Sequence, residues 1–303
     1  MNQPAPLRRG DKVAIVAPAR KVSPKEMQPA INMFEHWGLH TVVPQGLYEE
    51  FHQFAGTDNH RAQILQQVID DDEIRAVFCA RGGYGTARII DQIDFSKLAT
   101  HPKWIIGYSD ATILHNCIYA HDLCPTVHAI MPINITADTS DSPATRTLHD
   151  LLFSTKPLDY TFRNTDSLNR QGSATAPIVG GNLSILYSLL GTPYDIDTRG
   201  KILMIEDLDE YLYHIDRMML ALRHSGKLQG LKGLIIGQFT DLHDNSTPFG
   251  MSLYDIVSNA TKGYDFPICF NAPFGHIEQD NLALPLGTTA TLTVFPDSAH
   301  LSL

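Results

Sequence analysis

Short apolar runs alternate with segments of helical periodicity through the first half of the chain, and this alternation sharply limits the folds open to the sequence. Strands that alternate with helices build βαβ units, in which the strands are parallel and helices cover both faces of the sheet. We therefore predict an α/β fold with an N-terminal doubly wound parallel-sheet domain. The predicted strands are 12–16, 39–43, 76–80 and 104–108, and the predicted helices are 24–37 and 59–69.

The first predicted helix carries sequence signals at both of its ends. Ser23 is followed three residues later by Glu26, which makes a capping box, and Pro24 occupies the first helical position. Gly38 ends the helix, because glycine readily adopts the left-handed conformation found just beyond a helix C-terminus.

The second half of the chain has a more mixed pattern. Apolar runs and helical segments continue, but residues 288–295 alternate apolar and polar side chains, as in a half-exposed antiparallel strand. We therefore predict a smaller C-terminal domain of mixed α/β type. Its predicted strands are 201–205, 233–239, 267–271 and 288–295, and its predicted helices are 182–190 and 215–222.

Between residues 136 and 176, Ser, Thr, Asp, Asn and Pro accumulate and the hydrophobic periodicity fades. We interpret this stretch as an exposed connection with a hairpin near 158–162. The predicted organisation is a nucleophile domain at 1–137, a linker at 138–176 and a C-terminal domain at 177–303.

The composition excludes several classes of partner. The chain has 33 acidic and 23 basic residues, for a net charge of −10, so it should repel nucleic acid and anionic membranes. The first apolar run is closed by Pro18, too early for a signal peptide, and no segment approaches the ~20 apolar residues of a membrane span. The four cysteines are scattered, as expected of reduced thiols. We predict a cytoplasmic protein with no nucleic-acid or membrane partner.

Ser109 stands between a predicted strand and a helix-like segment. A serine in such a turn presents its hydroxyl above the sheet edge, beside the first N–H groups of the helix. One interpretation makes Ser109 a nucleophile, and the other makes it a helix N-cap, which is the commoner use of serine at such a place. The better-known nucleophile pattern has glycine two residues later, where this chain has Ala111.

A serine nucleophile needs a base and a carboxylate that orients the base. Glu206 directly follows four apolar residues, so we expect its carboxylate to be partly desolvated and to pair with a histidine. The alternative is that Glu206 is a helix N-cap or a surface acid. His276 lies in a Pro-Phe-Gly-His turn after a strand, where rigid neighbours can hold a base. The chain has 14 histidines, so this position alone does not identify the base.

Two glycine-rich loops follow predicted strands and can present backbone N–H groups to a ligand. The segment Arg81–Gly85 is either an anion or oxyanion cradle or a tight turn, and it matches no nucleotide-binding pattern. Asn182, after two glycines, either faces a ligand or caps the following helix. The histidines show no zinc spacing, so we predict no metal and no other cofactor.

Taken together, several motifs resemble those of the LD-carboxypeptidase family of serine peptidases, and the likeness extends over most of the chain. The family includes muramoyltetrapeptide carboxypeptidases, which remove terminal D-alanine from cytoplasmic cell-wall tetrapeptides during recycling, and relatives that confer immunity to microcin C. The motifs are Ala80–Gly85, Gly107–Asp110, Gly180–Leu183, Ile205–Asp207, Phe274–His276 and Asn281–Gly287.

The resemblance implies that Ser109 is the nucleophile, His276 the general base and Glu206 the carboxylate that orients the base. It also implies an active site between an N-terminal and a C-terminal domain, a homodimeric assembly and a small muropeptide substrate.

The same resemblance implies an oxyanion hole of backbone N–H groups. They correspond to Asp110, just after the nucleophile, and to the glycine loop, where Gly83 is the first choice and Gly82 the second. Exopeptidase action also needs a group for the free terminal carboxylate. Arg81 can supply a bidentate contact, and Asn182 is a further substrate-binding candidate.

Two other functions stay open at this point. The first is a microcin C-type immunity hydrolase, which would use the same nucleophile on a peptidyl or aminoacyl nucleotide conjugate. The second is a non-catalytic protein that binds a small anion with its glycine loops.

Overall fold

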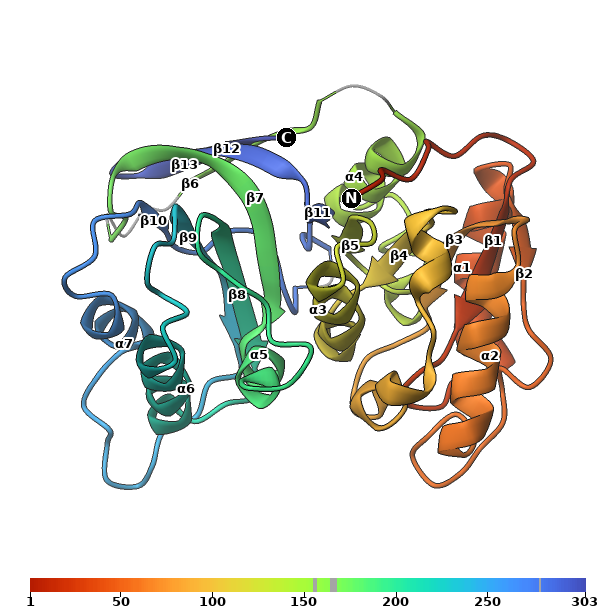
Figure 1. The fold of residues 1–303 in the computed structure, drawn as a ribbon, viewed down its shortest axis with the longest axis horizontal. Coiled ribbons are helices and arrows are strands. Elements are labelled where there is room, and N and C mark those ends of the chain that lie inside the picture. Colours follow the sequence, from red (N-terminus) through yellow and green to blue (C-terminus); the bar gives the residue numbers. More distant parts are fainter. Residues whose placement is uncertain (155–156, 164–167, 278) are drawn as a thin grey trace. The chain divides into compact units, whose positions relative to one another are not determined.

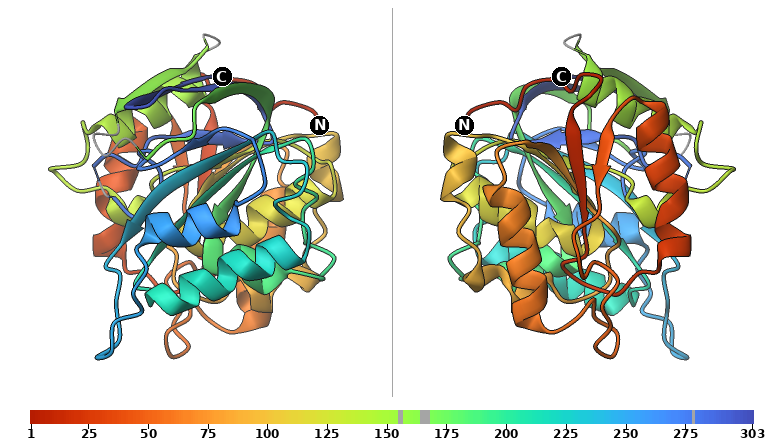
Figure 2. Two further views of the ribbon diagram at one scale, coloured as in Figure 1. Left: turned by 90° about the vertical axis from the view of Figure 1, so that its left-hand side faces the viewer. Right: turned by 90° about the vertical axis from the view of Figure 1, so that its right-hand side faces the viewer.

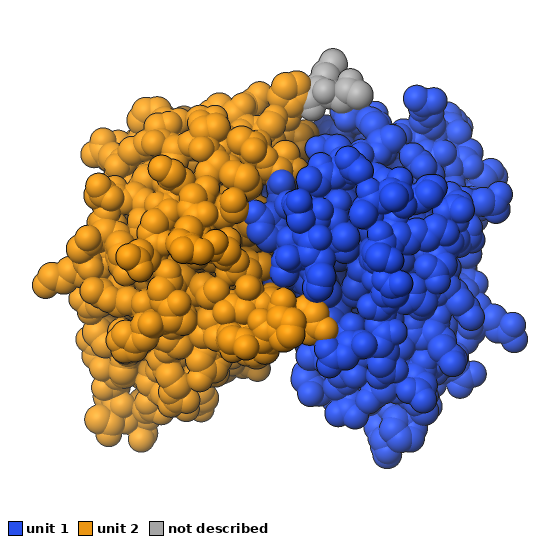
Figure 3. Space-filling view, viewed as in Figure 1, with its two compact units in different colours: residues 1–156, 278–287 blue, residues 157–277, 288–303 orange. Residues whose placement is uncertain are grey.

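The chain folds into two compact units, which we describe separately (Figure 3). The computed structural model describes residues 1–154, 157–163, 168–277 and 279–303. The first unit comprises residues 1–156 and 278–287, and the second comprises residues 157–277 and 288–303.

The first unit is a doubly wound α/β unit (Figure 1). Its strands are β1 (Lys12–Val16), β2 (His40–Val42), β3 (Ile74–Cys79), β4 (Trp104–Gly107), β5 (Thr126–His128) and β11 (Leu284–Leu286). Its helices are α1 (Pro24–His36), α2 (Asp58–Asp70), α3 (Thr112–Ala120) and α4 (Pro143–Phe153), with 3₁₀ turns at Thr86–Arg88, Ile90–Gln92, Ser96–Ala99, Ser109–Ala111 and Pro132–Asn134.

In this sheet the strand order is β11-β5-β4-β3-β1-β2, with every pair parallel except β11 with β5. Helices α1 and α2 lie on opposite sides of β1 and β2 (Figure 2). The chain leaves β1 toward β2 on one side and later returns to β3 on the other. The carboxyl ends of β1 and β3 therefore form the switch point at which open α/β sheets bind ligands.

Helix α1 begins as its sequence signals predict. The Ser23 hydroxyl accepts a hydrogen bond from the Glu26 N–H at 3.3 Å, and the Glu26 carboxylate accepts one from the Ser23 N–H at 2.7 Å. This reciprocal capping box satisfies backbone donors that the helix itself leaves unpaired.

The second unit is a mixed sheet with three helices among its described residues. Its strands are β6 (Asp159–Arg163), β7 (Gly172–Asn182), β8 (Ile202–Leu208), β9 (Gly233–Thr240), β10 (Ile268–Cys269), β12 (Thr289–Val294) and β13 (Ser298–Ser302). Its helices are α5 (Leu183–Leu189), α6 (Leu212–His224) and α7 (Leu253–Ala260).

This second sheet has the order β10-β9-β8-β7-β12-β13-β6. The strands from β10 to β7 are parallel, and those from β7 to β6 are antiparallel. Helices α6 and α7 lie side by side over one face of the parallel part (Figure 2). The predicted fold class, a doubly wound domain followed by a mixed α/β domain, is confirmed.

The stretch 138–176 differs from the expected exposed connection. It contains helix α4, which is capped by Ser142 and buries Leu148 and Leu152. The apolar stripe of this helix is difficult to recognise in the sequence because polar residues surround it. The expected hairpin near 158–162 is also a different structure. Strand β6 pairs antiparallel with β13, far away in the sequence, because their alternating apolar faces complete the sheet.

The two units also differ from the predicted ranges 1–137 and 177–303. Residues 278–287 belong to the first unit because β11 pairs with β5, between Leu284 and His128 for example. A pairing between segments so distant in sequence carries no local signal. Among the described residues, no helix is both long and apolar enough to cross a membrane.

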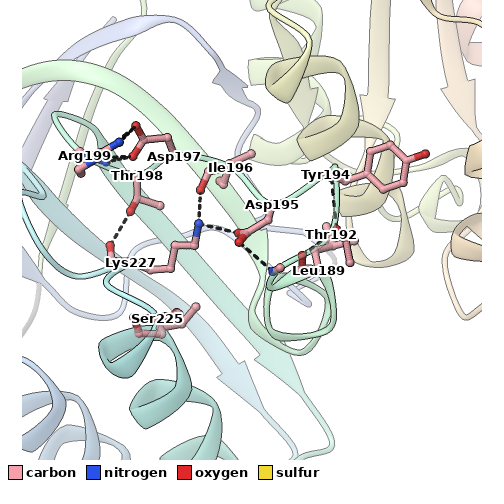
Figure 4. A network of polar contacts seen from close by, with 12 residues as sticks. Leu189, Thr192, Tyr194, Asp195, Ile196, Asp197, Thr198, Arg199, Ser225 and Lys227 are labelled. Carbon is pink, nitrogen blue, oxygen red and sulfur yellow. Dashed lines mark hydrogen bonds and ion pairs between the residues drawn. The ribbon is translucent and has the colours of Figure 1, made fainter.

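A polar network fixes the loop before β8 (Figure 4). The Lys227 ammonium lies 2.7 Å from an Asp195 carboxylate oxygen and donates to the Ile196 carbonyl at 2.7 Å. The Asp195 carboxylate also accepts a hydrogen bond from the Gly191 N–H at 2.9 Å, and the Thr198 hydroxyl donates to the Lys227 carbonyl at 2.6 Å. Because β8 begins at Ile202, four residues after Thr198, the network helps to set the position of the strand that carries Glu206.

Candidate active site

Ser109 lies in a strained turn at the end of β4. Its φ is +61°, a left-handed conformation that is uncommon for a residue with a side chain. Neither the 3₁₀ turn Ser109–Ala111 nor helix α3 is capped by a side-chain hydrogen bond. The structure therefore does not use Ser109 as a helix cap, and its half-buried side chain stands on a sharp strand-to-helix turn of the nucleophile-elbow type.

The glycine loop after β3 approaches this serine closely. A Cβ atom at Gly82 would lie 2.8 Å from both Cβ and Oγ of Ser109, so any side chain there would collide with the hydroxyl. Gly83 has a φ of +106°, which glycine adopts without strain. At Gly82 the loop backbone therefore lies too close to Ser109 for any residue with a side chain.

Buried polar side chains hold the same loop in place. The Asp110 carboxylate, 1% exposed, accepts a hydrogen bond from the Thr86 N–H at 2.9 Å. The buried Arg61 guanidinium donates to the Gly85 carbonyl at 2.9 Å and also to the carbonyl of Pro18. Burial raises the pKa of Asp110, and its hydrogen bonds with Thr86 oppose that rise.

Glu206 and His276 form a buried pair in the second unit. Glu206 is 0% exposed on β8, and its Oε2 lies 2.7 Å from Nδ1 of His276, whose side chain is 13% exposed. A carboxylate at Nδ1 leaves Nε2 of the imidazole as the atom that can exchange a proton with a substrate or nucleophile.

Two glycines make the space that Glu206 fills. A Cβ at Gly275 would lie 2.9 Å from Glu206 Oε2, and a Cβ at Gly237 would lie 3.1 Å from Glu206 Cβ and 2.5 Å from the Phe274 carbonyl oxygen. Gly275, directly before His276, must therefore lack a side chain so that the Glu206 carboxylate can reach His276.

Asn182 performs a structural task. Its Oδ1 accepts a hydrogen bond from the Ile185 N–H at 3.1 Å as the cap of α5, and its amide donates to the Asp207 carboxylate at 2.8 Å. Asp207 also accepts from the Ser184 N–H at 2.8 Å. Burial, followed by the neighbouring Glu206 carboxylate, raises the pKa of Asp207 to about 7.

Arg81 is half-buried at the start of the glycine loop. Its guanidinium donates to the Lys21 carbonyl at 3.4 Å and lies 4.0 Å from a Glu26 carboxylate oxygen. Both contacts are long, so among the described residues the guanidinium retains donors without a close partner.

Comparison with known proteins places this fold and these motifs in one family. The chain matches the LD-carboxypeptidase N-terminal domain over residues 13–129 and the LD-carboxypeptidase C-terminal domain over residues 175–292. It is also 35% identical over 298 residues to the probable murein peptide carboxypeptidase of Bacillus subtilis, covering 98% of this chain and 93% of that protein. The chain belongs to the LD-carboxypeptidase family. The resemblance predicted from the motifs is confirmed.

Solved structures agree with this LD-carboxypeptidase assignment. The muramoyltetrapeptide carboxypeptidase from Oxalobacter formigenes superposes with a TM-score of 0.85 at 26% identity, covering 96% of this chain and 98% of that chain. The microcin C7 self-immunity protein MccF superposes with a TM-score of 0.87 at 19% identity, covering 99% of this chain and 98% of that chain, which establishes a shared fold.

In this LD-carboxypeptidase family member the predicted site residues fall into two groups. Ser109, Asp110, Gly82, Gly83 and Arg81 belong to the first unit, and Glu206, His276 and Asn182 belong to the second. Within the described ranges, no three His, Cys, Asp or Glu side chains cluster as metal ligands would.

Sequence reasoning missed Arg61, which anchors the glycine loop from helix α2. A signal for it exists. Arg61 shares the apolar stripe of that helix with Leu65 and Val68, at spacings of four and seven residues, and an arginine on a buried face needs polar partners.

Proposed function

We propose that this protein is a serine-type LD-carboxypeptidase that releases the terminal D-alanine of murein tetrapeptides. The names of its relatives support the substrate class. The observation that carries the serine mechanism is the contact of 2.7 Å between the fully buried Glu206 carboxylate and Nδ1 of His276. A buried carboxylate that orients an imidazole is the arrangement that activates a hydroxyl nucleophile.

In the proposed reaction, Ser109 Oγ attacks the carbonyl carbon that precedes the terminal D-residue. His276 Nε2 takes the serine proton and later delivers it to the leaving amine, while Glu206 stabilises the imidazolium between these steps. The products of this half-reaction are an acyl-enzyme ester and free D-alanine. Water then attacks the ester with His276 as the base, releasing the tripeptide and restoring Ser109.

Backbone N–H groups of Asp110 and Gly83 are the proposed oxyanion donors, with Gly82 as the second choice for the loop. The close approach of Gly82 to Ser109 supports a location of this loop beside the attacked carbonyl. Because Ser109 and His276 belong to different units, the proposal requires that the active protein bring them into one catalytic site.

The decisive experiment measures D-alanine release from a defined muropeptide tetrapeptide by wild type, Ser109→Ala and His276→Ala. We expect each variant to lose at least about a thousandfold in kcat/KM. The thermal unfolding midpoint should stay unchanged in Ser109→Ala and fall in His276→Ala, because the buried Glu206 carboxylate loses the imidazole that it contacts. Pentapeptide serves as the control substrate, from which we expect no D-alanine release.

Two outcomes would contradict the proposal. Near-wild-type hydrolysis by Ser109→Ala would remove the nucleophile assignment. Hydrolysis of an aminoacyl sulfamoyl nucleoside, with none of tetrapeptide, would instead indicate an activity related to the ligand in the MccF structure.

We also propose that the protein acts in the cytoplasm as a homodimer, without a metal or organic cofactor. Four buried cysteines with free thiols support a reducing compartment. Light scattering at the working concentration tests the assembly, and fractionation of cells that express the protein tests its location.

A further inference from the structure

Arg20 lies on the loop that follows β1, at the switch point of the first sheet. Strands β1 and β3 are neighbours, with Val16 opposite Cys79, and the Ala80 N–H donates to the Val16 carbonyl at 2.7 Å. The loops that leave these two strands therefore begin side by side. Open α/β sheets bind ligands in the crevice between such loops.

The Arg20 side chain contacts the glycine loop directly. A Cβ at Gly83 would lie 2.6 Å from Cγ of Arg20 and would collide with its Cδ, so the arginine stem covers the space that a side chain would need. The neighbouring Gly82 faces Ser109 with the same lack of room. Adjacent glycines thus contact the proposed nucleophile on one side and Arg20 on the other.

The backbone of Arg20 is fixed although its side chain is exposed. Arg20 forms an antiparallel bridge with Phe54, and the Lys21 N–H donates to the Gln53 carbonyl at 3.0 Å. A guanidinium on a fixed backbone loses less freedom when it binds a ligand.

Two cations near Arg20 are paired with carboxylates, whereas Arg20 is not. Lys21 forms an ion pair with Glu50 at 2.5 Å, and Arg61 pairs with Asp58. Within the described part of the chain, the Arg20 guanidinium has no ion pair or hydrogen bond. An uncompensated positive charge at the switch point of a protein with a net charge of −10 indicates an anionic ligand.

The geometry points to Arg20 as the residue that binds the free C-terminal carboxylate of the peptide. This inference rests on the proposed function. In a carboxypeptidase substrate, that carboxylate is three bonds from the attacked carbonyl carbon, so the two groups lie only ~3–4 Å apart. A carbonyl oxygen at the Gly83 N–H thus places the carboxylate next to Arg20, whose planar fork accommodates both carboxylate oxygens. Arg81, which has contacts with Lys21 and Glu26, is then a neighbour of this carboxylate subsite.

The test uses two peptides that differ in one group, a tetrapeptide that ends in D-alanine and the same peptide that ends in D-alaninamide. We expect wild type to prefer the free acid. Arg20→Gln should lower kcat/KM for the acid on the order of 10- to 200-fold and change kcat/KM for the amide little. The acid-to-amide ratio, which is kcat/KM for the acid divided by kcat/KM for the amide, should therefore fall by the same factor. Arg20→Lys keeps the positive charge but cannot make a bidentate contact, so its acid-to-amide ratio should lie between those of wild type and Arg20→Gln.

Two further variants complete the design. Lys25→Gln removes one positive charge from an exposed position nearby and should leave the acid-to-amide ratio at its wild-type value. Arg81→Gln distinguishes the two guanidinium groups, and we expect it to reduce the ratio less than Arg20→Gln does. D-alanine, tested as a product inhibitor, should inhibit Arg20→Gln more weakly than wild type.

The outcomes separate this inference from the proposed function. An unchanged ratio in Arg20→Gln, or a ratio that collapses in Arg81→Gln instead, overturns the role of Arg20 while wild-type hydrolysis of the acid leaves the carboxypeptidase proposal standing. A wild-type protein that hydrolyses neither peptide overturns both.

Discussion

The carboxylate of Asp110 accepts a hydrogen bond from the backbone N–H of Thr86 at 2.9 Å, and both residues are buried. Asp110 directly follows Ser109, and Thr86 directly follows the glycine loop. This one bond therefore joins the serine turn to the glycine loop, which are the two segments that supply N–H groups to the proposed oxyanion hole. The relative position of the two segments therefore depends on the Asp110 side chain. The backbone N–H of the same residue is one of the proposed oxyanion donors.

We expect Asp110→Ala to lower kcat by about 10- to 100-fold with a smaller change in KM, because misplaced oxyanion donors weaken stabilisation of the transition state. Asp110→Asn keeps an acceptor for the Thr86 N–H and should retain activity within about fivefold. Steady-state kinetics with tetrapeptide checks this order. Equal losses in the two variants would contradict the positioning role.

The left-handed backbone of Ser109 predicts a difference in stability between two inactive variants. Glycine adopts a φ of +61° without strain and alanine does not, so Ser109→Gly should be more stable than Ser109→Ala by about 1 kcal/mol. Urea unfolding of both variants measures this difference. A Ser109→Ala protein that is as stable as Ser109→Gly would show that the turn relaxes when the hydroxyl is removed.

Gly275 should be essential for the rate because of its contact with Glu206. Gly275→Ala places a Cβ 2.9 Å from the carboxylate oxygen that contacts His276, at a φ of +124°. A displacement of the pair by ~1 Å costs on the order of a hundredfold in rate, so we expect at least that loss in kcat/KM.

Gly263→Ala is the matched control for this prediction. Gly263 also has a positive φ, of +92°, but nothing lies within 4 Å of the Cβ position. This variant should lose about 1 kcal/mol of stability and keep its activity. Similar activity in the two variants would contradict the role of Gly275.

Asp207 should make the protein less stable as the pH rises. Burial, followed by the Glu206 carboxylate, raises the pKa of Asp207 to about 7 from an ordinary value of 3.8. Between these pH values the folded protein holds a proton that the unfolded chain releases, so the free energy of unfolding falls as the pH rises through this window. Relative to wild type, Asp207→Asn should gain on the order of 3 kcal/mol between pH 4.5 and pH 8.

Asp197→Asn provides the comparison for this pH dependence. Hydrogen bonds from Arg199 lower the pKa of Asp197 to about 2, so this group titrates below the window in both states. Its stability difference from wild type should be the same at pH 4.5 and pH 8. If Asp207→Asn behaves in the same way as Asp197→Asn, Asp207 does not titrate within the window.

Local patterns predicted several elements well. The helix at Pro24–His36 is set by a capping box, and the strands at Lys12–Val16 and Trp104–Gly107 by compact apolar runs. The segment of α4 was missed because polar residues around its buried leucines mask the periodicity. The partner of β6 could not be found locally, since strand pairing depends on contacts between distant segments.

The same division applies to the site. By itself, the sequence determined the parallel α/β character of the first unit, the family motifs and the candidate residues Ser109, Glu206 and His276, because these depend on nearest neighbours in the chain. Tertiary structure alone decided what those residues contact. It buried Glu206 against His276, brought Gly82 to Ser109, and placed Arg20 and Arg61 around the glycine loop. Such contacts join segments that the chain separates, so they follow from packing and hydrogen bonding in the folded state rather than from any local pattern.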